Sequence, residues 1–111
     1  MIRVGAALLV FCACADDHGP RLESATPAAA SAGAIVIITG TRLCGESADC
    51  ETAGGAIRIG LDNPVQAMII GYTDTAAQLR IPSIAPIGET VFVATVNERA
   101  SNALDFEVLP P

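Results

Sequence analysis

Aromatic residues are scarce in this sequence, which contains no Trp, a single Tyr (Tyr72) and three Phe. Any core must therefore be built from Ile, Val, Leu and Ala, where a fully buried Val- or Leu-sized side chain contributes about 1.5–3 kcal/mol. Hydrophobic residues make up 51% of the 111-residue chain, which is enough for one small domain. Flat carbohydrate-binding platforms need exposed Trp and Tyr, so the scarcity of both disfavours a glycan-binding role.

Positive charge is also scarce. The chain has no Lys, its six basic residues are all Arg, and these do not cluster. With twelve acidic residues the formal net charge is −6. A nucleic-acid binder needs a basic stripe to displace counterions from phosphates, so no nucleic-acid partner is expected. The same sign opposes electrostatic docking on anionic lipid head groups.

Groups suited to catalysis are few as well. The single histidine, His18, precedes the region predicted to fold. A catalytic triad or Cys–His pair needs an imidazole held rigidly against a nucleophile. Gly54-Gly55 precedes a predicted strand without a following helix or Lys, so it is not a phosphate-binding loop. We therefore expect no enzyme activity and no cofactor.

The N-terminal residues have the layout of an export signal. One Arg precedes an apolar run from Val4 to Ala13, which ends abruptly at Asp16. The run is too short for a membrane-spanning helix, which takes about 20 residues. Its length matches the apolar core of a signal peptide, so export is predicted.

Two processing routes fit this signal. Residues 11–14 (FCAC) resemble a bacterial lipobox, in which cleavage precedes a lipid-carrying cysteine, here Cys14, although the family pattern prefers Leu where Phe11 stands. The alternative is ordinary cleavage after Ala15. The favoured route divides the chain into a signal peptide (1–13, or 1–15 under the alternative), a tether (14–19) and one domain (20–109). The expected location is the cell envelope, lipid-anchored at the outer membrane or surface, or otherwise periplasmic or secreted.

Two further cysteines, Cys44 and Cys50, flank a short polar segment, and export predicts a local disulfide between them. Closing a loop of about 7 residues stabilises a fold by roughly 2.4 kcal/mol in the chain-entropy account. Glu46, Asp49 and Glu51 make this segment a candidate recognition loop. Calcium binding by these carboxylates is a weaker alternative, and two thiols without further ligands do not form a zinc site, so no metal is expected.

Short apolar stretches separated by turn residues follow along the rest of the chain. Several alternate apolar and polar residues, which is typical of strands with one face on a core. Residues 28–33 are small and are interpreted as a linker, and Gly40 as a bulge. The seven predicted strands comprise Arg21–Ala25, Ala34–Thr39, Ile57–Ile59, Ala67–Tyr72, Ala77–Ile81, Phe92–Val96 and Leu104–Val108.

Seven short strands in roughly 90 residues predict an all-β protein, an immunoglobulin-like sandwich of two sheets. The alternation places six larger side chains in the core: Ile57, Ile59, Leu79, Ile81, Phe92 and Phe106. The cysteine pair is too local to be the inter-sheet bridge of antibody domains. The architecture is therefore expected to be Ig-like without being antibody-like.

Four stretches together resemble the IPT/TIG family, Ig-like domains of plexins, transcription factors and bacterial surface proteins. They are PRLESATP (20–27), GAIVIITGTRL (33–43), IRIG (57–60) and the closing pattern SNA…FEV (101–108). Their order covers nearly all of the chain from Pro20 to Leu109. The departures are the Cys44–Cys50 loop and residues 97–99, where the family has a tighter, glycine-containing turn.

The resemblance implies an E-set-type Ig fold and a role in binding, dimerisation or spacing. Export and negative charge exclude the transcription-factor branch. The expected function is a non-catalytic envelope module that contacts another envelope protein or acts as a spacer, with the lipid anchor as its one membrane contact. The alternative is a secreted domain that recognises a glycan or other envelope component.

Overall fold

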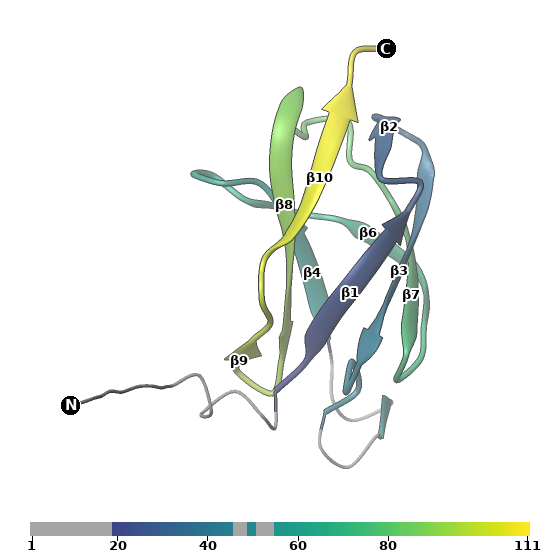
Figure 1. Cartoon of the computed structure of the whole chain (residues 1–111), viewed down its shortest axis with the longest axis vertical. Coiled ribbons are helices and arrows are strands. Elements are labelled where there is room, and N and C mark those ends of the chain that lie inside the picture. The colour runs from purple at the N-terminus through teal and green to yellow at the C-terminus, as the bar shows by residue number, and fades with distance from the viewer. Residues whose placement is uncertain (1–18, 46–48, 51–54) are drawn as a thin grey trace, which may run out of the picture.

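The computed structural model describes residues 19–45, 49–50 and 55–111, and within them ten strands form two sheets (Figure 1). The predicted all-β class is therefore confirmed. The predicted signal peptide and Cys14 lie outside the described residues. In chain order the strands are β1 (Arg21–Thr26), β2 (Ala29–Ser31), β3 (Ile35–Thr41), β4 (Ala56–Ile59), β5 (Val65–Gln66), β6 (Met68–Tyr72), β7 (Ala76–Arg80), β8 (Gly88–Val96), β9 (Arg99–Ala100) and β10 (Leu104–Leu109).

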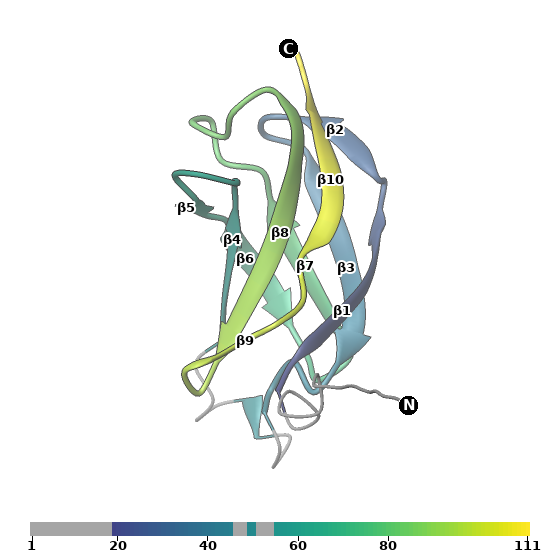
Figure 2. The same cartoon turned by 60° about the vertical axis from the view of Figure 1, so that its left-hand side comes forward.

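The two sheets have different strand orders. The first sheet runs β1-β3-β7-β6, and the second runs β2-β10-β8-β4-β5 with β9 paired to β8. The pairs are antiparallel except β2 with β10, which is parallel. In Figure 2 strands β8 and β10 of the second sheet lie in front of β7 and β3 of the first, so the sheets form two layers.

The core lies between these layers and contains residues from both sheets. All six side chains predicted to lie in the core are buried: Ile57, Ile59, Leu79, Ile81, Phe92 and Phe106. Phe92 of β8 and Phe106 of β10 pack at a tilt, with their ring centroids 4.8 Å apart. The strand alternation in the sequence thus identified the inward-facing side chains correctly.

The prediction of a linker over residues 28–33 was wrong for Ala29–Ser31, which form β2. After β1 the chain passes through a cis peptide bond at Thr26-Pro27 and leaves the first sheet for the second. There β2 pairs with the end of β10, and the Ala30 side chain is buried. Small residues suit this position because they let β2 pack closely, and they give no strand signal in the sequence.

The irregularity expected at Gly40 lies on the neighbouring strand. The register shifts between Leu22 and Ser24 of β1, opposite Gly40. A Cβ atom at Gly40 would collide with the carbonyl oxygen of Arg21, which explains the glycine. β3 is internal to its sheet as predicted, although Ile35 and Ile37 on its outer face are exposed.

The turn between β8 and β9 has the left-handed geometry usually supplied by glycine. Its two central residues, Asn97 and Glu98, have φ angles of 52° and 67°. Both positive values fit a two-residue hairpin turn of type I′, in which Asn is favoured and Glu is not. A tight turn is therefore made here without glycine.

A side-chain amide joins β1 to the segment before β10. The Asn102 Oδ1 atom accepts a hydrogen bond from the Leu22 N–H at 2.8 Å, and its Nδ2 atom donates to the Leu22 carbonyl at 3.0 Å. Ser101 Oγ accepts from the Ala94 N–H at 2.8 Å. Ser101 and Asn102, which carry part of the family resemblance, thus hold the first strand against the second sheet.

Candidate functional site

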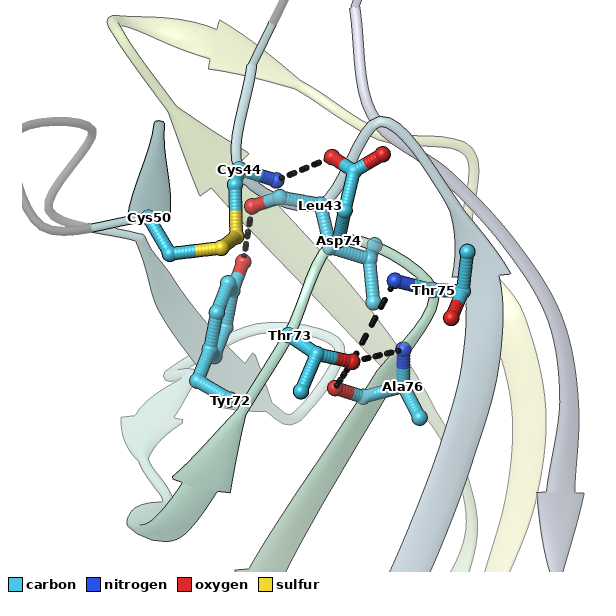
Figure 3. The surroundings of a disulfide bond; sticks show 8 residues. All are labelled: Leu43, Cys44, Cys50, Tyr72, Thr73, Asp74, Thr75 and Ala76. Atoms are coloured by element: carbon cyan, nitrogen blue, oxygen red, sulfur yellow. Dashed lines mark hydrogen bonds between the residues drawn. A yellow bond between two sulfur atoms is a disulfide. The ribbon is translucent and has the colours of Figure 1, made fainter. Parts of the chain in front are cut away.

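A disulfide joins Cys44 to Cys50, as predicted, with a Cα–Cα distance of 4.5 Å (Figure 3). Cys44 is fully buried, whereas Cys50 is exposed. Of the three carboxylates in the candidate recognition loop, Asp49 is described and exposed, and Glu46 and Glu51 lie outside the described residues. A disulfide of this kind is typical of an oxidising, exported environment.

The first residues of this loop are fixed by Asp74, from the turn between β6 and β7. The Leu43 N–H donates to the Asp74 main-chain carbonyl at 2.9 Å. The Cys44 N–H donates to the Asp74 side-chain Oδ1 at 3.1 Å. One residue thus satisfies two consecutive amides and fixes the direction in which Leu43 and Cys44 leave β3. Figure 3 shows the bond to the Cys44 N–H.

Tyr72 secures the same point from the end of β6. Its hydroxyl donates to the Leu43 carbonyl at 2.6 Å. Burial raises the pKa of the Tyr72 phenol above its ordinary value, and the nearby Asp74 carboxylate raises it further. The single Tyr of the chain therefore stays neutral and hydrogen-bonded at the base of the loop, with its partly buried side chain packed against the core.

The turn that carries Asp74 is held by Thr73. Its Oγ1 atom accepts a hydrogen bond from the Ala76 N–H at 3.1 Å, and the Thr73 N–H donates to the Ala76 carbonyl at 2.8 Å. Sequence reasoning missed Tyr72 and Asp74 as partners of the cysteine loop. The available signal was the polar Thr-Asp-Thr run at 73–75, between two predicted strands, because such residues bond to nearby main chain in turns.

Two other segments meet at this end of the molecule. A Cβ atom at Gly45, where φ is +87°, would lie 2.6 Å from Asn97 Nδ2 of the β8–β9 turn. Arg42 Nε donates to the Gly19 carbonyl at 3.3 Å. The start of the described chain, the disulfide and the β8–β9 turn therefore share one end of the sandwich (Figure 1).

The described residues contain no group of three His, Cys, Asp or Glu side chains placed to hold a metal ion. Within the same ranges, no helix is long and apolar enough to cross a membrane. What the geometry provides is a covalently closed loop whose base is fixed by Asp74 and Tyr72.

Comparison with known proteins identifies the fold alone. No family model matches the chain, and a search of curated proteins gives no significant match. Among solved structures, the chain is similar to part of a Bacteroides thetaiotaomicron protein described as a "putative phosphatase", with a TM-score of 0.52 and 16% identity. The match covers 82% of this chain and 18% of that protein. At this identity the likeness concerns the path of the backbone.

Proposed function

We propose that this chain is an exported, non-catalytic module of the cell envelope, anchored through lipid on Cys14, that contacts another envelope protein. The observation that carries the protein contact is the outer surface of the first sheet. Four large apolar side chains are exposed there: Ile35 and Ile37 on β3, and Met68 and Ile70 on β6. Exposed apolar groups gathered on one face mark interaction surfaces.

Charge on the same surface supports this proposal. Across β3, β7 and β6 the single charged residue is Arg80, in a chain of net charge −6. A protein partner can approach this surface without facing the carboxylates found elsewhere, such as Glu89, Asp105 and Glu107 of the second sheet. We name Ile35, Ile37, Met68 and Ile70 the apolar face.

Strand order supports an Ig-like, E-set-type sandwich. If β1, β3, β4, β6, β7, β8 and β10 are lettered A to G in chain order, the first sheet reads ABED and the second contains CFG. Immunoglobulin domains divide their strands in this way. Together with the stretches that resemble IPT/TIG domains, this order favours a binding or spacing module.

A lipid anchor on Cys14 would limit the distance between the domain and the membrane. Six tether residues, 14–19, reach at most about 20 Å when extended. Because Gly19 lies beside Arg42, the disulfide end faces the membrane, and the apolar face extends along the side of the domain. A partner that uses the candidate recognition loop would therefore bind close to the membrane surface.

Two measurements test the anchor and the contact separately. Radiolabelled palmitate should enter the wild-type chain and not the Cys14→Ser variant, and a mature N-terminus at Asp16 would refute lipidation. For the contact, pull-downs from envelope extracts should lose the partner with Ile37→Lys. Leu61→Lys, on the β4–β5 loop, is the control, because Leu61 is also exposed and lies off the apolar face. Equal recovery with both variants would place the contact elsewhere.

A further inference from the structure

Three hollows lined by described residues differ in charge. The first is lined by Glu89, Asp105 and Glu107, and the second by Asp62 and Glu89. The third, of about 500 Å³, contains Arg80 and no carboxylate. We name this third one the Arg80 hollow. Its lining includes Gly33, Met68, Arg80, Ile81, Pro82 and Ile84.

The Arg80 hollow is mostly apolar and partly preformed. Ile81, which is 1% exposed, forms its floor, whereas Met68 and Ile84 are 62% and 72% exposed at its rim. The floor is tied to the β2–β3 turn, because the Gly33 N–H donates to the Ile81 carbonyl and the Ile81 N–H donates to the Ala34 carbonyl, both at 2.9 Å. Binding of a ligand would therefore cost little conformational entropy in this part of the site.

Arg80 supplies the one charge of the hollow. Its Nη1 atom donates to the Gly33 carbonyl at 2.8 Å, which directs the guanidinium toward the β2–β3 turn. The described residues offer Arg80 no ion pair. A guanidinium carries five N–H donors, so most of them are available to a bound anion.

We propose that the Arg80 hollow binds a small molecule with an apolar body and one carboxylate. The carboxylate pairs with Arg80, and the apolar body covers Ile81 and lies between Met68 and Ile84. Sites of this size with an apolar lining and a few polar groups are typical of small-molecule binding. Asp62 and Glu89 in the adjacent hollow, which shares Ile84, repel the anionic end and so fix the ligand's direction.

The methyl group of Met68 can serve as an NMR probe of this site. The sequence contains two methionines, Met1 and Met68, and the processing proposed above removes Met1, so the mature methyl-labelled chain gives one methionine signal, which Met68→Leu should abolish. The mature chain is titrated with octanoate, octanol and octyltrimethylammonium. We expect the Met68 methyl to shift with octanoate, with affinity for octanol about tenfold lower and for the cation lower still.

Variants test the role of the charge. Arg80→Gln should reduce octanoate affinity to that of octanol and leave octanol binding unchanged. Arg58→Gln, at an exposed arginine of β4, is the matched control and should bind like wild type. Circular dichroism and the ligand-free methyl spectrum check that each variant is folded. The proposal is overturned if Met68 does not respond to millimolar octanoate, if Arg80→Gln leaves the octanoate affinity at its wild-type value, or if the three head groups bind equally.

Discussion

The side chains between the two sheets and the main chain at the disulfide end are held in place by different interactions. In the interior, Phe92, Leu79 and Ile59 are fully buried and depend on packing. At the disulfide end the Leu43 side chain also belongs to the core. The main chain there is fixed in addition by the Cys44–Cys50 bond, by the Asp74 carboxylate at the Cys44 N–H and by the Tyr72 hydroxyl at the Leu43 carbonyl. Core packing is cooperative, so removing one large side chain also weakens the contacts among its neighbours. The hydrogen bonds at the disulfide end can be removed one at a time, each at a smaller cost in stability.

The largest effect is expected from the interior. Phe92→Ala removes the largest fully buried side chain and its contact with Phe106, so we expect a loss of about 3–5 kcal/mol in unfolding free energy. A domain of this size has little stability to spare, and much of the variant should be unfolded at 25 °C. Urea denaturation followed by circular dichroism measures the change. Val93→Ala, on the outer side of the same strand, is the control and should cost far less.

At the disulfide end, breaking the covalent bond is the strongest change. We expect the Cys44→Ala/Cys50→Ala variant to lose about 2.4 kcal/mol, because the unfolded chain regains the entropy of a six-residue separation. The variant should keep its β-sheet spectrum, since Asp74 and Tyr72 still hold the base of the loop. Loss of the folded spectrum in the absence of denaturant would show that the disulfide end is as essential as the interior.

Removing the Tyr72 hydroxyl should lower the unfolding free energy by a smaller amount. Tyr72→Phe leaves the Leu43 carbonyl without its donor, and we expect a loss of about 1 kcal/mol near neutral pH in the same urea assay. The pH dependence provides a second readout. The pKa of Tyr72 is raised above 10.0, so the unfolded chain releases the proton first as pH rises. Stability from the phenol is fully present below about pH 10 and is lost as pH rises through the folded pKa. Tyr72→Phe should remove this alkaline decline, and an unchanged profile would contradict the assignment.

A substitution in the β8–β9 turn should raise the stability of the domain. Glu98 has a φ of 67°, which suits glycine better than a residue with a Cβ atom. We expect Glu98→Gly to raise the unfolding free energy by about 0.5–1 kcal/mol in urea denaturation. Glu98→Ala keeps the Cβ and removes the carboxylate, so a gain with Ala would trace the effect to charge.

The interior could be predicted from the sequence better than the disulfide end, for a physical reason. Alternation along β4, β7, β8 and β10 is local in the chain, and it identified the buried residues such as Ile57 and Phe106. Cys44 and Asp74 are 30 positions apart, and their hydrogen bond depends on how β3 and the β6–β7 turn meet in space. The disulfide was predictable because its cysteines are close in sequence and export limits their chemistry.

The missed strands have a related explanation. β2, β5 and β9 have three, two and two residues, too few to show alternation. Each forms because a longer neighbouring strand has main-chain groups free for pairing along its edge. Strand β10 provides such groups for Ala29–Ser31. The Asn102 amide that bonds to Leu22 joins residues 80 positions apart, which no local pattern reports. Short edge pairing and distant side-chain bonds are set by the tertiary fold.

The smallest effect on stability is expected from the candidate recognition loop. Replacing Glu46, Asp49 and Glu51 with Ser should change the unfolding free energy less than the substitutions above, because both cysteines are kept and the bond that closes the loop remains. Binding gives the contrast: if the loop makes the contact, recovery of the envelope partner in pull-downs should fall.

The matched control carries the same change of charge at another place. Asp62, Asp105 and Glu107 are exposed, and their triple replacement by Ser also adds three units to the net charge. If partner recovery falls with the loop variant and not with this control, recognition depends on the position of the loop carboxylates and not on overall charge. If recovery survives the loop variant and falls with Ile37→Lys, the disulfide end serves stability alone and the apolar face makes the contact.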